Sequence, residues 1–251
     1  MHKKEHQGAK ISAGILKGLV FASAALTFLV LFFLIVYILV HGIPNLTPQL
    51  FAWKYTSENA SMLPSIINTL IIVILSLVIA VPLGIFSAIY LVEYAKRGNK
   101  FVKIIRLTTE TLSGIPSIVY GLFGALFFVT ALKWGYSLLA GALTLSIMIL
   151  PLIMRTTEEA LKSVPDSFRE GSFGLGAGKL RTVFQIVLPS AIPGILAGVI
   201  LAVGRIIGET AALIYTAGAV AEVPSSIMGS GSTLAGHARS TRLLGSRLPR
   251  I

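Results

Sequence analysis

Hydrophobic residues gather in five long stretches of the chain, at roughly residues 19–40, 65–92, 112–132, 136–154 and 191–218. Each is about 20 residues long or more, the length that an α-helix needs to cross a hydrocarbon core of roughly 30 Å. Charged residues are absent between Lys17 and Lys54, and again between Glu58 and Glu93. The pattern therefore predicts an all-α fold, a polytopic membrane helix bundle with five clear spans.

Breaks in the pattern predict how the spans are shaped and joined. Pro82 and Gly84 predict a kink in the second span, which neighbouring helices can accommodate. Only residues 133–135 separate the third span from the fourth, so these two are expected to form a tight helical hairpin. At residues 113–117 we favour a plain helix start, with Pro116 in its first turn, over an unwound segment whose N–H groups bind an anion. The fifth span contains two small-xxx-small pairs that are expected to pack helices, Gly194/Gly198 and Gly204/Gly208.

Basic residues are concentrated in alternate connecting segments. Four lysines precede the first span, and the segments 93–111 and 155–190 contain five Lys or Arg residues each, whereas the other two connections contain only Lys54 and Lys133. Cytoplasmic segments of membrane proteins carry such an excess, so the N-terminus and both basic segments are expected in the cytoplasm. The first span is too long for a signal peptide and no small-residue cleavage site follows it, which favours an uncleaved anchor.

Charge and hydropathy divide the chain into a basic cytoplasmic N-terminus (1–18), a transmembrane domain (19–218) and an atypical basic tail (219–251). After five spans the tail should lie outside, yet residues 229–251 contain four arginines and no acidic residue, against the positive-inside trend. Two interpretations fit: a disordered basic tail, or a truncated or out-of-frame end that lacks a final span. We favour the second, which accurate sequencing of the 3′ end of the gene would test.

Composition excludes several classes of function. Of the 251 residues 55% are hydrophobic and 12% are charged, with a mean hydropathy of +0.85, whereas soluble domains carry roughly 25% charged residues and disorder needs low hydrophobicity. The net charge of +11 fits segments that face an anionic membrane surface, without a nucleic-acid partner. There is no cysteine, the four histidines are scattered, and no nucleophile pairs with a base. We therefore expect no metal site, no catalytic residue and no enzyme.

Arg205 and Glu209 are charged residues inside the fifth span, where a charge at mid-helix costs roughly 2.5–3.5 kcal/mol on insertion scales. Their spacing of i and i+4 places them on one face of a continuous helix, close enough to pair. The planar donor fork of arginine matches a phosphate-type oxyanion, so both residues, and Arg155 at the inner end of the fourth span, are candidates for a substrate path. The alternatives are a pair that only locks helices together, a proton relay at Glu209, and an interfacial anchor at Arg155.

The segment 155–190 has a helical pattern of its own. Two threonines and two glutamates at residues 156–159 look like a helix start, residues 164–166 break that helix, and Asp166 or Ser167 is placed to cap a second short helix that glycines then end. The run GSFGLGAGK fails as a phosphate-binding P-loop, because Phe173 occupies the first glycine position and Leu180 the hydroxyl position. We therefore expect no nucleotide or other cofactor to be bound by this chain.

Seven residues at fixed offsets stand out in this segment: Glu170, Gly171, Ser172, Gly176, Ile186, Leu188 and Pro189. Three residues separate the third from the fourth, and nine separate the fourth from the fifth. This spacing resembles the pattern E-A-A-x3-G-x9-I-x-L-P in the cytoplasmic coupling loop of ABC importer permeases, with glycine and serine in place of the two alanines. In that family the loop docks into a cleft of the partner ATPase, so the resemblance implies that these seven residues couple the chain to ATPases.

Three further stretches, LSGIPSIVYGLFG (112–124), PSAIPGILAGVIL (189–201) and GRIIGETAALIYTAG (204–218), resemble the phosphate-specific branch of these permeases and its A-type subunit. The resemblance covers roughly residues 60–226 and implies the type I permease fold, with an expected sixth span missing. It implies a transport subunit for inorganic phosphate in the plasma or inner membrane of a bacterium or archaeon. The implied partners are a second homologous permease, two ATPase subunits that bind ATP and magnesium, and an extracytoplasmic phosphate-binding protein.

Other functions stay open on the residues alone. A permease for another oxyanion, such as sulfate or molybdate, would differ in which anion competes for the receptor. An ion-coupled secondary transporter would use Arg205 and Glu209 without any ATPase, although no inverted internal repeat supports it. A non-transporting scaffold or sensor would keep only the docking function of the segment 155–190.

Overall fold

The computed structural model describes residues 2–45, 47–53, 55–56, 61–96 and 98–237, and every regular element within them is helical. The chain divides into two compact units, residues 1–50 and residues 51–251. The first unit contains α1 (His2–Gly42) and the short 3-10 helix η1 (Ile43–Asn45), and the boundary falls within a second 3-10 helix, η2 (Pro48–Phe51). The predicted first span lies within α1, whose stretch from Ala13 to Gly42 is long and apolar enough to cross a membrane.

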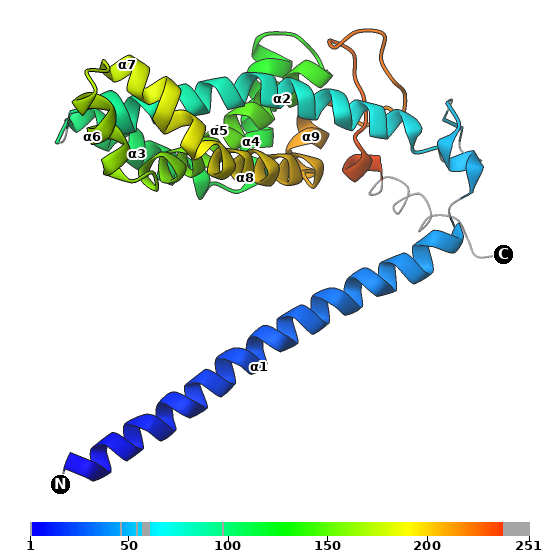
Figure 1. Ribbon diagram of the computed structural model, residues 1–251. Coiled ribbons are helices and arrows are strands. Elements are labelled where there is room, and N and C mark those ends of the chain that lie inside the picture. The colour runs from blue at the N-terminus through cyan, green and yellow to red at the C-terminus, as the bar shows by residue number, and fades with distance from the viewer. Residues whose placement is uncertain (1, 46, 54, 57–60, 97, 238–251) are drawn as a thin grey trace. The chain divides into compact units, whose positions relative to one another are not determined.

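Three long apolar helices form the frame of the second unit (Figure 1). They are α2 (Leu63–Ile89) with its π-helical continuation η3 (Tyr90–Tyr94), α5 (Leu138–Lys162), and a rod made of α7 (Lys179–Thr182), η5 (Val183–Val187) and α8 (Leu188–Ile207). The shorter elements are α3 (Lys100–Ser113), α4 (Ser117–Gly124), the π-helix η4 (Ala125–Ala131), α6 (Asp166–Gly174) and α9 (Ala211–Thr216).

The central helix of this unit is α5. It packs against α2, α8, α4, α3 and α9, and 67% of its membrane-length window is buried, compared with 33% for α2 and 28% for the rod Lys179–Ile207. The side chains of Leu145, Ile149 and Ile153 on α5 are almost completely buried in the main hydrophobic core. Side chains that α5 carries toward the other helices are therefore held in fixed positions.

Small and hydroxyl residues bring α2 close to α5. A Cβ atom added at Gly84 of α2 would lie 2.7 Å from Cγ2 of Ile153, so only glycine fits at this contact. The hydroxyl of Ser76 on α2 donates to the carbonyl of Ala142 at 3.1 Å, and the hydroxyl of Ser146 on α5 donates to the carbonyl of Ser76 at 3.2 Å. These reciprocal bonds satisfy buried hydroxyls that would otherwise be costly in a membrane interior.

Glycines of α8 serve the packing on α5 only in part. A Cβ atom added at Gly194 would lie 2.7 Å from a side-chain carbon of α5, and one added at Gly198 would overlap the side chain of Thr156. The packing role expected of this pair is therefore confirmed. The second pair makes no such contact within the described chain, because a Cβ atom at Gly204 meets nothing within 4 Å and Gly208 caps the end of α8, so its packing role stays a prediction.

The predicted spans occur with changed bounds. The second and fourth lie in α2 and α5, and α2 is one uninterrupted helix through Pro82. The third, expected over residues 112–132, corresponds to α4 and η4 (Ser117–Ala131), and α3 meets this helix at a bend of 101° across residues 114–116. The fifth begins at Lys179 rather than at residue 191, and it ends at Ile207 with α9 as a separate short helix.

A tight turn joins η4 to α5, as the sequence predicts for the third and fourth spans. Lys133 and Gly135 have φ angles of 56° and 69°, in the left-handed region that reverses the chain direction. The indole of Trp134 stacks on the ring of Phe128 with their centroids 5.7 Å apart, which covers the turn.

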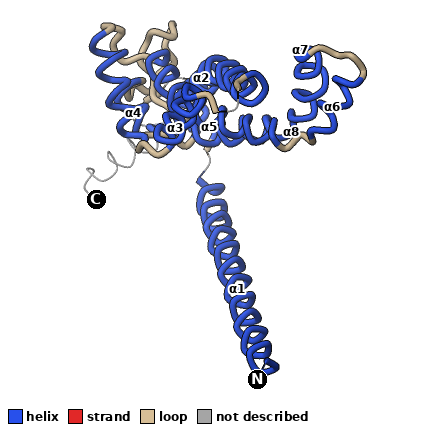
Figure 2. Tube along the Cα trace, turned by 90° about the vertical axis from the view of Figure 1, so that its left-hand side faces the viewer, coloured by secondary structure: helices blue, strands red, loops and turns tan. Residues whose placement is uncertain are grey.

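The second unit has two ends that differ in what covers them, as Figure 1 shows, and Figure 2 views this unit from the end that carries α6 and α7. The Lys162 end, where η3 and α5 finish, carries α6, α7 and the start of α3. The Leu63 end, where α2 begins, is covered by residues 217–237. The coupling-loop motif and the basic segments therefore lie at the Lys162 end.

Hydrogen bonds hold residues 217–237 on the Leu63 end. The amide Nδ2 of Asn68 donates to the carbonyls of Glu222 and Ser232 at 2.9 and 3.1 Å, and the backbone N–H of Leu234 donates to the hydroxyl of Thr69 at 3.0 Å. The part of the predicted tail up to residue 237 is thus packed on α2. Residues 238–251, which contain all four tail arginines, lie outside the described residues, and the expectations about them stay predictions.

Candidate functional site

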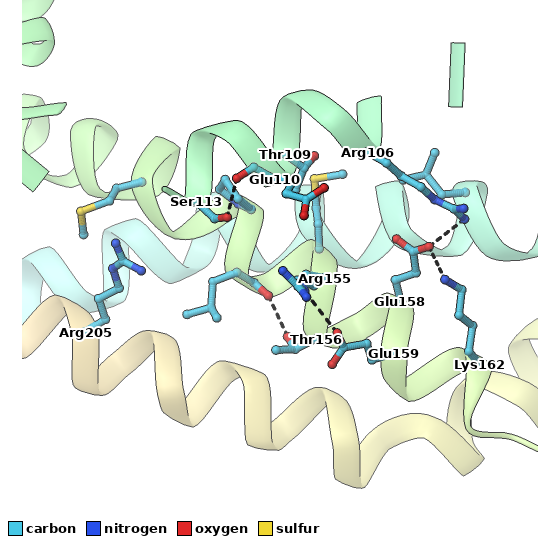
Figure 3. A pocket seen from close by; sticks show the side chains of 15 residues that line it. Arg106, Thr109, Glu110, Ser113, Arg155, Thr156, Glu158, Glu159, Lys162 and Arg205 are labelled. Carbon is cyan, nitrogen blue, oxygen red and sulfur yellow. Dashed lines mark hydrogen bonds and ion pairs between the residues drawn. The ribbon is translucent and has the colours of Figure 1, made fainter. Parts of the chain in front are cut away.

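A cleft of about 640 Å³ opens between α3, α5 and α8 in the half of the bundle toward the Lys162 end (Figure 3). Its walls include residues 106–113 of α3, residues 148–162 of α5 and Arg205 of α8. Two of the predicted path residues, Arg155 and Arg205, therefore face the same cavity from different helices. This α3–α5–α8 cleft is the candidate site.

Seven charged side chains face the cleft: Arg106, Arg155, Lys162, Arg205, Glu110, Glu158 and Glu159. Glu158 binds two of the cations, Nη2 of Arg106 at 2.7 Å and Nζ of Lys162 at 2.6 Å. Glu159 binds Nε of Arg155 at 3.2 Å on the same face of α5. Within the described part of the chain Arg205 forms no ion pair, so it is the cation that the cleft leaves uncompensated.

Glu209 does not join Arg205, which corrects the predicted pair. The spacing i and i+4 brings side chains together only along a continuous helix, but α8 ends at Ile207 and Gly208 caps it. The Glu209 carboxylate is buried and accepts a hydrogen bond from the backbone N–H of Ala212 at 3.1 Å, at the start of α9. Glu209 therefore caps α9, and it is not among the residues that line the cleft.

Residues 114–116 form a break between two helices. Pro116 is the N-cap residue of α4 and accepts a hydrogen bond from the N–H of Val119 at 3.0 Å, so it lies just before the first turn rather than inside it. Ser113, the last residue of α3, lines the cleft and donates its hydroxyl to the carbonyl of Glu110 at 2.8 Å. The break turns α3 away from α4 and so opens one wall of the cleft.

The segment 155–190 is more helical than the sequence pattern indicates. Residues 156–159 continue α5 and do not start a new helix, because α5 ends only at Lys162. The break predicted at residues 164–166 is confirmed, and α6 follows with Pro165 as its N-cap residue. No side-chain cap bond exists there, so the predicted cap by Asp166 or Ser167 is wrong.

The seven motif residues are distributed from α6 to the start of α8. Glu170 and Gly171 are exposed on α6, whereas Ser172 is buried and its hydroxyl lies 2.8 Å from that of Thr182 on α7. Gly176 has a φ of 81° and makes the turn between α6 and α7. The last three positions stand at the junction of η5 and α8, at Ile186, Leu188 and Pro189.

Apolar side chains protrude around this motif. Leu175 is 91% exposed at the turn, and Phe168, Phe173 and Leu180 are between 47% and 66% exposed. Several exposed apolar side chains on one short surface segment are typical of a protein docking site.

Arg169 is a residue that the sequence analysis treated only as one of several basic charges. Its Nε and Nη2 donate to the same oxygen of Glu93 in η3 at 3.2 and 2.8 Å. Its Nη1 donates to the carbonyl of Val164 and to Asp166, and its Nη2 donates to the carbonyl of Leu161. Only 15% of the Arg169 side chain and 9% of the Glu93 side chain are exposed. Their separation of 76 positions explains why sequence spacing did not reveal the pair.

Among the described residues, no group of three or more His, Asp or Glu side chains is placed to hold a metal ion. The glycine-rich run over residues 171–179 forms the end of α6 and the turn into α7, not the strand–loop–helix arrangement of a P-loop. The expectation that this chain binds no cofactor of its own stays a prediction.

Comparison with known proteins places the chain among transport proteins. A family model described as "Binding-protein-dependent transport system inner membrane component" matches residues 80–235, which include the cleft, the coupling motif and α9. The solved structures of the MetNI methionine ABC transporter in inward-facing conformations include a chain with a TM-score of 0.53 and 21% identity, covering 72% of this chain and 78% of that one. This likeness establishes the fold of ABC importer permeases.

Curated relatives extend the similarity along most of the chain. The probable ABC transporter permease protein YqgI of Bacillus subtilis is 39% identical over 83% of this chain and 71% of its own length. The phosphate transport system permease protein PstA of Pasteurella multocida is 40% identical over 70% of this chain and 63% of its own length. PstA of Mycobacterium leprae is 36% identical over 71% of this chain and 56% of its own length, so the match spans little more than half of that relative.

Proposed function

This chain belongs to the family of binding-protein-dependent transport system inner membrane components, the permease subunits of ABC importers, and from that membership we propose that it carries inorganic phosphate across the membrane. It is a PstA-like permease, and several of its relatives are named phosphate transport permeases. One observation supports the substrate most directly: Arg205 faces a cleft of about 640 Å³ without an ion pair among the described residues.

The chemistry of the cleft suits an oxyanion that is bound weakly and released quickly. A guanidinium presents planar N–H donors whose spacing matches two oxygens of a phosphate. Arg155 supplies a second guanidinium. In its ion pair with Glu159, the Arg155 side chain is 63% exposed and the Glu159 side chain is 65% exposed. Exposed pairs of this kind contribute only about 0–1 kcal/mol, so an entering phosphate can replace Glu159 as the partner of Arg155. We therefore assign substrate contact to Arg205 and Arg155.

Glu209 takes a different role in this proposal. Its carboxylate is occupied by the N–H of Ala212 outside the cleft, so it fixes the start of α9 beside the end of α8. It acts on the path through the position of the Arg205 backbone, not through the anion itself.

The coupling motif supports a set of partners. We propose that α6 and α7, with Glu170 and the exposed Leu175 between them, dock on an ATPase subunit that binds ATP and magnesium. A second homologous permease completes the path, a second ATPase binds that permease, and an extracytoplasmic phosphate-binding protein delivers the anion. In this arrangement the N-terminus and the Lys162 end lie in the cytoplasm of a bacterium or archaeon, and the Leu63 end lies outside.

Uptake of labelled phosphate at low concentration tests the proposal. Cells that lack their own A-type permease are complemented with this chain, and insertion is checked by blotting. The Arg205→Gln variant should lower uptake about tenfold or more, because a charge-assisted hydrogen bond contributes roughly 1.5–3 kcal/mol. Arg205→Lys should retain part of the activity, and Lys100→Gln, an exposed charge that does not line the cleft, is the matched control.

The outcome distinguishes the remaining functions. Competition by excess sulfate or molybdate would assign another oxyanion, and uptake that persists without the ATPases would indicate an ion-coupled transporter. Normal uptake by an inserted Arg205→Gln variant would remove Arg205 from the substrate path.

A further inference from the structure

The helices α6 and α7, called the coupling helices below, contact the same short segment of the bundle, the π-helical turn η3 at the end of α2. Arg169 of α6 binds Glu93 in η3, with 2.8 Å between Nη2 and Oε1. Lys179, the first residue of α7, places its ammonium 5.1 Å from the centroid of the Tyr94 ring. Two cations from two helices thus hold two consecutive residues, which fixes both the position and the rotation of η3 relative to the coupling segment.

Arg169 is the more constrained of these two contacts. Its guanidinium donates to Glu93, to Asp166 and to the carbonyls of Leu161 and Val164. It therefore ties together η3, the end of α5 and the first turn of α6. Since both side chains of the pair are largely buried, removing either partner would leave a charge without compensation.

The helices α6 and α7 are also linked to each other. The hydroxyls of Ser172 and Thr182 lie 2.8 Å apart in a buried position, and the N–H of Ala177 donates to the carbonyl of Ser172 at 3.1 Å. A displacement of the exposed turn between α6 and α7 therefore moves both helices. Arg169 and Lys179 transmit this displacement to η3. The wider π-helical turn of η3 interrupts the regular α-helical hydrogen bonding of α2.

We propose that Arg169 is a positioning residue that transmits the displacement of α6 and α7 to α2 through Glu93, with Lys179 on Tyr94 as the second contact. This inference rests on the proposed function, in which an ATPase moves α6 and α7. It adds the route of the movement: α2 packs along α5, its continuation η3 places Leu91 in the wall of the cleft, and both are displaced together with α6 and α7.

A coupling ratio tests the inference in the complete complex, purified with its partner permease and ATPases and reconstituted in liposomes. The measured quantity is phosphate imported per ATP hydrolysed. Arg169→Gln and Glu93→Gln should each lower this ratio at least about tenfold while ATP hydrolysis continues, and Arg169→Lys should lie between them and the wild type. Arg181→Gln is the matched control, because it removes a charge from α7 whose side chain, among the described residues, bonds only Gln185 on the same rod.

A distance measurement tests the same link without depending on transport. The chain has no cysteine, so spin labels can be attached at Ser167→Cys on α6 and Val78→Cys on α2, both exposed positions. The wild-type background should give one narrow distance distribution with and without a bound ATP analogue. Arg169→Gln should broaden it or make it depend on the nucleotide.

The outcomes separate this inference from the proposed function. A wild-type complex that imports no phosphate would contradict the proposed function, and the spin-label distances would still test the link. Variants that lower the amount of complex but leave the coupling ratio and the distance distribution unchanged would overturn the inference, because Arg169 would then only stabilise the fold.

Discussion

Arg205 and Glu209 lie four positions apart, yet only the arginine faces the cleft. The sequence identified both correctly as unusual charges in an apolar stretch, but their pairing depended on a helix that continues past Gly208. The helix ends at Ile207, and the Glu209 carboxylate turns to an N–H of α9. A glycine directly before the acid was the available sign of a helix end.

Substitution of Glu209 should therefore affect stability more than transport. Glu209→Gln keeps an acceptor oxygen for the N–H of Ala212 and should leave uptake per inserted molecule near the wild-type value. Glu209→Ala removes the cap and should lower the free energy of unfolding by about 1 kcal/mol. Thermal unfolding of the purified chain and the uptake assay measure the two effects. If the Glu209→Gln variant inserted normally but lost uptake, the Glu209 carboxylate would belong to the substrate path after all.

Two glycines of α8 give a matched pair for packing. Gly198→Ala places a methyl group against Thr156 and should destabilise the chain by about 1–3 kcal/mol through overpacking. Gly204→Ala meets no atom within 4 Å and should be neutral, or more stable by up to about 1 kcal/mol, since alanine favours a helix. Unfolding curves of both variants, recorded under the same conditions, measure the change in the free energy of unfolding for each. Equal destabilisation would show that α8 packs differently.

The candidate site was predictable where a residue conflicts with its local surroundings. Arg205 and Arg155 stood out because charges are rare inside or beside apolar spans, and both line the cleft. Arg169 did not stand out, because a basic residue in the basic segment 155–190 has nothing unusual around it. Its role comes from Glu93, which only the folded chain brings near.

At the scale of elements, hydropathy located helices better than it located their ends. The second and fourth predicted spans begin within two residues of α2 and α5. The ends differ because α5 continues with polar residues up to Lys162 and the rod of α8 begins with polar residues at Lys179, where no apolar signal marks helix. The bend between α3 and α4 was also hidden, because the predicted third span starts in the last two residues of α3 and runs across residues 114–116 into α4.

The turn between the coupling helices provides a prediction at this scale. Gly176 has a φ of 81° in open space, so Gly176→Ala should cost about 1–2 kcal/mol from backbone strain alone. Gly176→Asn should recover part of the loss, because asparagine tolerates the left-handed region. Copurification of the ATPase with each variant is the readout, with Gly174→Ala as the control. If the Gly176→Ala variant copurified with the ATPase as well as the wild type does, docking would not depend on the backbone conformation of this turn.

At the scale of the whole molecule, residues 217–237 belong to the folded bundle, although the sequence analysis assigned residues 219–251 to an atypical basic tail. Backbone and side-chain hydrogen bonds to α2 and α5 hold this segment, and such bonds leave no hydrophobic period in a sequence. The family model likewise extends to residue 235. Composition alone could not distinguish such a packed irregular segment from a solvated one.

The side chain of Asn68 should be needed to hold residues 217–237 against α2. Its amide donates to two carbonyls of the segment, so Asn68→Ala should leave both acceptors unsatisfied and cost about 1–3 kcal/mol. Hydrogen–deuterium exchange over residues 217–237 should rise sharply in this variant, and exchange over α6 should not change. Gln185→Ala, an exposed amide at the other end, is the control. Unchanged exchange over residues 217–237 would mean that other contacts hold the segment.

The unpaired guanidinium of Arg205 also has an electrical consequence. Its cleft has four cationic and three anionic side chains, so a passing sodium or potassium ion is repelled while an anion is admitted. In the proposed orientation, the negative interior of a cell drives anions outward by roughly 2.3 kcal/mol per elementary charge per 100 mV. A passage open at both ends would therefore leak phosphate out of the cell. Accumulation against this voltage depends on a closed outer gate more than on tight binding, and the resting importer must be sealed on that side.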